Sequence, residues 1–168
     1  MKDYFLQLAE YNAWANNRAI GWITQISDEQ WERKLESSFG SIRETVIHIA
    51  SAEKIWVDFW AITPEPVYLS SWFNGTKEEL IAIWQKASAD LKKNVENQPD
   101  DKFGQEVNFV YSHGGTGQMP FWQTFGHIIN HSTYHRGQLV TLLRTSGFVR
   151  LGNTDLATHY LTNYNAKI

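Results

Sequence analysis

The chain has 168 residues, enough for one domain spanning 1–168, and its 42% hydrophobic and 20% charged residues exclude a disordered or low-complexity protein. It contains no cysteine, which excludes disulfides, cysteine-ligated zinc, iron–sulfur clusters and a cysteine nucleophile. A formal net charge of -3, without any run of Lys or Arg, disfavours binding to nucleic acid or to an anionic membrane surface.

Apolar residues at helical spacing predict four long helices. These helices cover residues 2–26, 41–62, 76–98 and 120–146. The second helix begins at a sequence that matches a capping box, in which the side chains of Ser41 and Glu44 each bond the other residue's backbone N–H. The third helix begins at a similar pair, Thr76 and Glu79. The fourth begins at Pro120, which suits the first position of a helix.

Shorter elements are predicted between and after these helices. A turn that can include one helical turn begins at 27–29, and a loop covers about 66–75. Apolar and polar residues alternate in 103–118 before a glycine-rich turn, which is typical of a short β-hairpin or an ordered loop. A final short helix is predicted at 154–163. Four long helices with one extended insert predict an all-α four-helix bundle.

Two glycines lie inside the fourth predicted helix. Gly126 and Gly137 are separated by close to three whole turns, so they fall on nearly the same helix face. Glycine in a helix interior costs about 1 kcal/mol relative to alanine. We therefore expect this face to approach another helix closely.

No targeting or membrane-spanning segment is predicted. The N-terminal stretch carries Asp3 and Glu10 in place of a continuous apolar run, which is unlike a signal peptide. No stretch of about 18 uncharged apolar residues is present that could span a bilayer. The expected location is the cytoplasm.

Three of the six histidines follow one another at i, i+4 spacing on the fourth helix, namely His127, His131 and His135. An i, i+4 pair places two imidazoles on one helix face, close enough to chelate one ion. The two outer histidines are about 12 Å apart along the axis, so all three cannot share one ion. The spacing predicts a metal site either on His127 with His131 or on His131 with His135.

A third ligand has to come from another helix, and His48 is the candidate. It lies within the apolar run 46–50, where the alternative is a core histidine held by one hydrogen bond. A histidine pair in the same bundle favours the ligand. Three neutral imidazoles leave a divalent ion with an open position for water or substrate, as in catalytic sites. Imidazole suits zinc, nickel, copper and iron alike, so the ligands do not name the metal. We expect zinc or nickel, with iron and manganese as further candidates.

The other candidate residues are expected to be structural. The fourth helix has no acidic residue between Pro120 and Ser146, which argues against a di-iron bundle with its Glu-x-x-His motifs. His113, beside glycines, is expected to be solvated, and His159 to pack or to lie on the surface. Most tryptophans are expected in the core, and three could line a substrate cavity: Trp14, Trp56 and Trp122.

Much of the chain resembles the DinB family. Residues 130–138 (Asn-His-Ser-Thr-Tyr-His-Arg-Gly-Gln) are similar to its fourth-helix signature, and 11–16 (Tyr-Asn-Ala-Trp-Ala-Asn) to its first-helix motif. His48 is placed like the family's second-helix histidine. The segments 146–148 and 154–156 resemble its C-terminal part. The resemblance covers nearly the whole chain.

The resemblance implies an up-down-down-up four-helix bundle, often a homodimer. It implies a mononuclear divalent-metal site formed by His48, His131 and His135, with His127 as a neighbour one turn away. The wider superfamily includes bacillithiol S-transferases and mycothiol-dependent maleylpyruvate isomerase. A low-molecular-weight thiol is therefore the implied cosubstrate.

Different functions follow as hypotheses. In one, the metal holds an external thiol as thiolate, which attacks a small electrophile; a metal-bound hydroxide acting in hydrolysis is equally compatible. In another, the protein is a non-catalytic metal-binding stress-response protein, and in a third its histidines only pack. Gln138 lies near the His131 and His135 stripe and can orient a ligand or bound water, whereas Arg136 points away, toward a carboxylate partner or a dimer interface.

Overall fold

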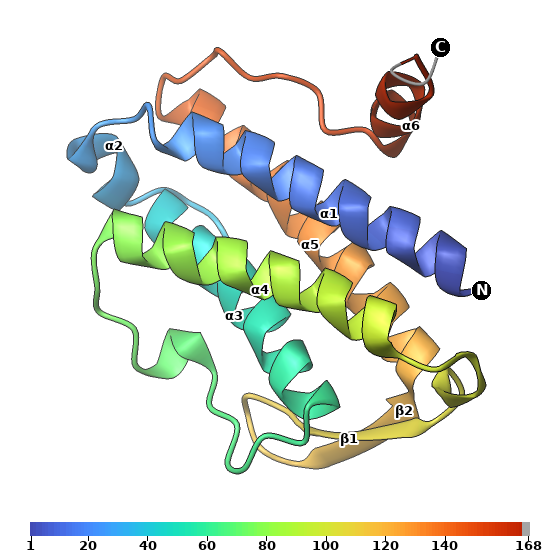
Figure 1. Ribbon diagram of the computed structural model, residues 1–168. Coiled ribbons are helices and arrows are strands. Elements are labelled where there is room, and N and C mark those ends of the chain that lie inside the picture. The colour runs from blue at the N-terminus through green and yellow to red at the C-terminus, as the bar shows by residue number, and fades with distance from the viewer. Residues whose placement is uncertain (166–168) are drawn as a thin grey trace.

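Four long helices lie side by side in the computed structural model, which describes residues 1–165 (Figure 1). They are α1 (Lys2–Ile23), α3 (Ile42–Trp60), α4 (Lys77–Asn97) and α5 (Phe121–Thr145). Helix α1 packs against α4 and α5, and α3 packs against the same two helices. Helices α3 and α4 run in one direction while α1 and α5 run in the other, which confirms an up-down-down-up bundle (Figure 1).

The connections carry the shorter elements. These are α2 (Asp28–Glu32), the 3-10 turns η1 (Leu69–Ser71) and η2 (Asp100–Lys102), the strands β1 (Glu106–Val110) and β2 (Thr116–Pro120), and α6 (Leu156–Asn165). The long connection through η1 returns the chain along the bundle, so that α4 can run parallel to α3 (Figure 1). Helix α6 packs against α1.

The first and last helices differ from the predicted bounds. Helix α1 ends at Ile23 rather than at residue 26. Ile26 is buried in the core and so continues the apolar spacing, but it lies beyond the helix. The chain turns there because Ser27 and Gln30 form a capping box that begins α2. Helix α6 begins at Leu156 rather than at 154.

The predicted capping boxes have different outcomes. The box that begins α4 is confirmed, because Thr76 and Glu79 each bond the other residue's backbone N–H. At α3 the Ser41 hydroxyl accepts from the Glu44 N–H at 3.1 Å, as predicted. The Glu44 carboxylate accepts instead from Arg43 Nη1 at 2.8 Å, so the returning half of that box was predicted wrongly. A guanidinium gives the carboxylate a charged partner that the backbone N–H cannot match.

Residues 106–120 form a β-hairpin, which decides between the two predicted forms of this insert. Strands β1 and β2 are antiparallel, with Phe109 opposite Gly117. The Phe109 ring lies over Gly117, in space that a Cβ atom would need, which explains glycine at this position. Pro120 ends β2 and is the N-cap residue of α5, rather than its first helical residue.

A polar layer divides the core into two apolar clusters. One cluster lies toward α2 and includes Ile23, Ile49 and Trp84, while the other lies toward the hairpin and includes Phe5 and Phe125. Along each of the four long helices, buried polar residues separate the residues of one cluster from those of the other. Six of them form the polar layer: Asn12, Asn16, Glu53, Ser88, Ser132 and Arg136.

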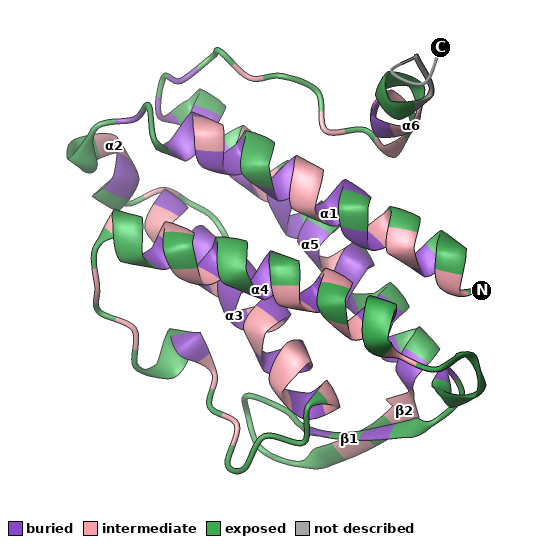
Figure 2. Cartoon of the chain, viewed as in Figure 1, coloured by how far each residue is buried: buried purple, intermediate pink, exposed green. Residues whose placement is uncertain are grey.

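Helices α1, α4 and α5 each bury one face and expose the other, whereas the residues of α3 are buried or half-buried apart from Glu44 (Figure 2). Burial of apolar side chains on the inner faces is the main driving force for packing the bundle. The outer faces carry charged residues, including Lys86 and Asp90 of α4, which form an i, i+4 ion pair. None of the helices within residues 1–165 is long and apolar enough to cross a bilayer.

The two glycines of α5 do not mark a close helix contact within the chain. A Cβ atom built at Gly126 or Gly137 would meet nothing within 4 Å. The predicted close approach at this face is therefore wrong. Gly126 lies instead in an open groove of about 620 Å³ between α1 and α5, which Tyr4 and Trp122 also line.

We expect Gly126→Ala to raise the free energy of unfolding by about 1 kcal/mol, because alanine is the better helix former and has open space here. Gly117→Ala should lower it by about 1–3 kcal/mol, because the new methyl group overlaps the Phe109 ring. Urea denaturation of both variants measures the two values. A destabilised Gly126→Ala would contradict an open groove and indicate that another surface packs there in solution.

Candidate metal centre

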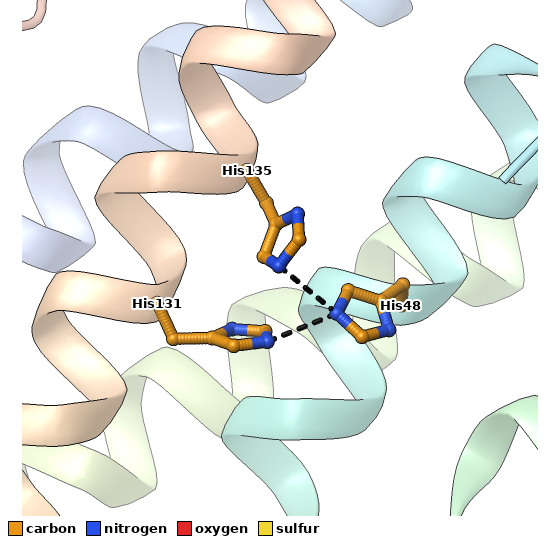
Figure 3. Close-up of side chains that lie close together, drawn as sticks. All are labelled: His48, His131 and His135. Carbon is orange, nitrogen blue, oxygen red and sulfur yellow. Dashed lines mark hydrogen bonds between the residues drawn. The ribbon is translucent and has the colours of Figure 1, made fainter. Parts of the chain in front are cut away.

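Three imidazoles from two helices converge at one point of the bundle. His48 projects from α3, and His131 and His135 project from α5 toward it (Figure 3). The Nε2 atom of His48 lies 2.9 Å from Nε2 of His131 and 3.2 Å from Nε2 of His135. Within residues 1–165 these histidines form the one group of three or more metal-binding side chains whose ligand atoms lie within 4.8 Å of one another.

The local sequence explains this convergence. His131 and His135 lie one turn apart and therefore share a face of α5. Helix α5 packs against α3, which brings that face opposite His48. The spacing argument left open whether His131 pairs with His127 or with His135, and the structure brings His135 into the group.

The separation of the ring nitrogens fits a single metal ion. Zinc–nitrogen bonds of about 2.0–2.1 Å at tetrahedral angles place two ligand nitrogens about 3.3–3.4 Å apart. The two nitrogen–nitrogen distances at His48, 2.9 and 3.2 Å, are close to this value. Small ring movements would complete the coordination geometry, with no rearrangement of the helices.

The protons of the imidazoles also favour an ion between them. Nδ1 of His135 lies 2.7 Å from Oε1 of Gln138, which can only accept, so His135 carries its proton on Nδ1 and has a free lone pair on Nε2. Nδ1 of His131 is buried without a hydrogen-bond partner. Hydrogen bonds within the protein thus do not satisfy every ring nitrogen of His48, His131 and His135, the histidine trio. A cation between the three Nε2 atoms would accept the lone pairs of all three.

Burial and mutual repulsion keep the imidazoles uncharged. Burial, with a smaller contribution from His135, lowers the pKa of His48 from 6.5 to about 4. Burial together with repulsion from the neighbouring imidazoles lowers the pKa of His131 to about 3. Burial also lowers the pKa of His135, against an opposing effect of its bond to Gln138. At pH 7 all three rings are neutral, which is the form that binds metal.

Aromatic side chains flank the three imidazoles. The Phe39 ring stacks on His48 at 4.1 Å between centroids and lies edge-on to His135 at 5.4 Å. Tyr134, which is 63% exposed, lies edge-on to His135 at 4.9 Å. Phe39 was not predicted to lie here, because this residue belongs to the connection before α3. No periodic pattern in that connection places a side chain relative to the helices.

The remaining histidines lie outside the trio. His127 is exposed on α5, with its ring 5.8 Å from His131 and 5.5 Å from Trp56. His113 is exposed in the hairpin turn, as expected. His159 is buried, and its ring lies 5.9 Å from Tyr11, which confirms a packing role.

The three tryptophans proposed as cavity residues have different environments. Trp56 is buried in the cluster beside the hairpin. Trp122 is 43% exposed and lines the groove between α1 and α5. Trp14 packs against His159 at 5.3 Å between ring centroids. Only Trp56, through His127, lies near the trio.

Arg136 takes neither of the two roles expected for it, a direct bond to a carboxylate or a place in a dimer interface. Its side chain is 2% exposed, so the predicted role in a dimer interface is wrong. Its Nη1 atom donates to Oδ1 of Asn12 at 2.6 Å and to Oδ1 of Asn16 at 2.8 Å. The predicted carboxylate partner is reached only through these two amides, which donate in turn to Oε1 of Glu53.

The sequence profile of the DinB family matches residues 1–167. The chain belongs to the DinB family. Protein DinB of Bacillus subtilis (strain 168) is 22% identical over 156 residues, which cover 88% of this chain and 89% of that protein. Membership of the family agrees with the resemblance drawn from the α1 and α5 motifs.

Solved structures of DinB-like proteins share the fold. A DinB-like protein from Bacillus cereus ATCC 10987 has a TM-score of 0.69 at 18% identity, covering 89% of this chain and 95% of that chain. A DinB-like protein from Bacillus subtilis has a TM-score of 0.66 at 14% identity, covering 89% of this chain and 98% of that chain. At these identities the likeness establishes the helical bundle.

We expect the metal-free protein to lose stability as the pH falls. Histidines in the unfolded chain titrate near pH 6.5, and those of the trio titrate lower in the folded state. Below about pH 6.5 the folded state therefore binds fewer protons than the unfolded state does. The free energy of unfolding decreases as the pH falls from there toward about pH 3. Urea unfolding between about pH 7 and pH 5, where carboxylates stay ionised, measures the effect.

His131→Ala provides the control for this pH dependence. The variant removes the imidazole with the lowest pKa, so its stability should fall less steeply with decreasing pH. An unchanged slope in His131→Ala would contradict the origin assigned to the effect.

Proposed function

We propose that this DinB-family protein is a metal-dependent enzyme whose single divalent ion is bound by His48, His131 and His135. The observation that carries the proposal is the convergence of the three Nε2 atoms, with His48 at 2.9 and 3.2 Å from the other two. Three protein ligands are one fewer than a structural tetrahedral site uses. The remaining position would be open to an exchangeable ligand.

A low-molecular-weight thiol is the proposed occupant of that position. Three neutral imidazoles would leave a bound divalent ion its full charge, and that charge would hold a coordinated thiol as its thiolate. The chain has no cysteine, so a sulfur nucleophile has to come from a second molecule. The reaction that fits is transfer of the thiol sulfur to a small electrophile, in which a carbon–sulfur bond forms as the electrophile's leaving group departs or its double bond opens.

The side chains around the trio have roles in this proposal. Oε1 of Gln138 accepts a hydrogen bond from the Nδ1–H group of His135 and so directs Nε2 of that ring toward the other two imidazoles. Phe39 and Tyr134 supply apolar surface beside His135, against which a hydrophobic electrophile could lie. Hydrolysis by metal-bound hydroxide would use the same three ligands.

Metal content tests the ligand set. Protein purified without an affinity tag or a nickel column should contain, or take up from zinc, nickel or manganese solutions, close to one equivalent of metal by elemental analysis. His131→Ala should lose this metal, because the variant lacks one of the three Nε2 ligands and keeps only two imidazoles. His127→Ala is the matched control, since it removes a histidine one turn away on the same helix and should retain the metal.

A cobalt-substituted sample tests whether the site is open. Addition of a small thiol such as cysteine or mercaptoethanol should change the visible cobalt spectrum and introduce sulfur-to-cobalt charge transfer. Metal that binds in the wild type with a spectrum unaffected by thiol, but altered by hydroxide at rising pH, would favour hydrolysis. A spectrum that responds to neither would favour a non-catalytic metal-binding protein, and protein that takes up no metal would overturn the proposal.

A further inference from the structure

Glu53 forms the centre of the polar layer that crosses the bundle. The residue has no exposed surface, and its carboxylate lies between all four long helices. Its Oε1 atom accepts hydrogen bonds at 2.8 Å from the amides of Asn12 and Asn16 and from the hydroxyl of Ser132. Its Oε2 atom accepts at 2.8 Å from the hydroxyl of Ser88.

The partners of Glu53 suit a carboxylate. The two amide N–H groups and the two hydroxyls can all donate to its oxygens. The compensating charge is Arg136, whose guanidinium donates to the Oδ1 atoms of the same two asparagines that donate to Glu53 through Nδ2. Asn12 and Asn16 are thus fixed in one orientation between a buried anion and a buried cation.

The same layer is joined directly to the histidine-bearing turn of α5. Ser132 follows His131 in the chain, and Arg136 follows His135, so two members of the layer alternate with two histidines of the trio. Glu53 lies on α3, five residues beyond His48. The Ser132–Glu53 hydrogen bond therefore ties α5 to α3 at the level where their imidazoles meet.

We propose that Ser132 and Glu53 are positioning residues, which hold α5 against α3 so that the imidazoles of His131 and His135 face His48. This inference rests on the proposed function for its consequence in metal binding. Among residues 1–165, neither Ser132 nor Glu53 forms a hydrogen bond with an imidazole nitrogen of His48, His131 or His135. A shift of well under 1 Å between the helices is enough to spoil bond lengths that a metal site fixes within about 0.2 Å.

The chain contains a matched control for this claim. Ser88 donates to the same carboxylate at the same 2.8 Å distance as Ser132, and both side chains are buried. Ser88 belongs to α4, which carries no member of the histidine trio. Each substitution by alanine removes one hydroxyl donor from Glu53 and keeps a good helix former. Ser88 also accepts a hydrogen bond from Nδ2 of Asn16 at 2.8 Å, so Ser88→Ala should lose at least as much stability as Ser132→Ala.

Cobalt affinity and the imidazole signals of the metal-free protein test the inference together. Ser132→Ala should weaken cobalt binding about tenfold, as expected for loss of a supporting contact, and shift the visible spectrum of the bound cobalt. In the metal-free protein it should also move the ring NMR signals of His131 and His135. Ser88→Ala should leave the affinity, the spectrum and the ring signals close to those of the wild type.

Equal effects of the two substitutions on cobalt affinity and on the ring signals would overturn the inference. The bonds from Ser88 and Ser132 to Glu53 would then stabilise the bundle in the same way, with no particular role for Ser132 in placing the imidazoles. A wild-type protein that binds no cobalt would contradict the proposed function alone. The ring signals of the metal-free variants would then still decide whether Ser132 positions the imidazoles.

Discussion

Burial of the Glu53 charge constrains all four long helices at once. Removal of an ion from water costs several kcal/mol even after the protein relaxes, unless other groups satisfy the charge. Here four hydrogen-bond donors and a guanidinium do so, and they come from α1, α4 and α5 around a carboxylate on α3. A slip of any helix by one turn would leave the anion or Arg136 without partners. The layer therefore fixes the register of the bundle more sharply than apolar packing alone could.

The register of the helices also determines the positions of the three imidazoles in the candidate metal centre. The histidines of α5 alternate with Ser132 and Arg136, so the contacts that satisfy the buried charges also set the height and rotation of the imidazoles. Apolar clusters above and below the layer hold the helices together. Gln138 then sets the ring orientation of His135. The three imidazoles are neutral and their nitrogens converge, which is the state required to bind a cation.

Much of this arrangement could be predicted from the sequence, because it depends on local spacing. The four helices followed from apolar periodicity, and His131 with His135 from their i, i+4 separation. The choice between His127 and His135 could not follow from spacing, since both lie one turn from His131. It depends on which face of α5 meets His48, and only the resemblance to the DinB family indicated the answer.

The residues that sequence reasoning missed act across the bundle rather than along a helix. Glu53 reads as an ordinary polar position of α3, and nothing near it in sequence shows that its donors come from three other helices. Arg136 was expected to bind a carboxylate or to lie in a dimer interface, because it points away from the face that carries His131 and His135. The glycine pair of α5 was assigned to a close contact that the packed helices do not make at Gly126. The signal available in the sequence was a polar residue between two apolar stretches of each long helix.

The central claim is that His48, His131 and His135 bind one divalent ion and leave a position open. The most direct test is a crystal structure of the zinc- or cobalt-loaded protein with anomalous data collected at the absorption edge of the metal. We expect one anomalous peak, about 2.0–2.1 Å from each of the three Nε2 atoms, with solvent or an added thiol as the remaining ligand. An anomalous peak on His127 and His131, a fourth protein ligand that closes the site, or no peak among the three imidazoles would contradict it.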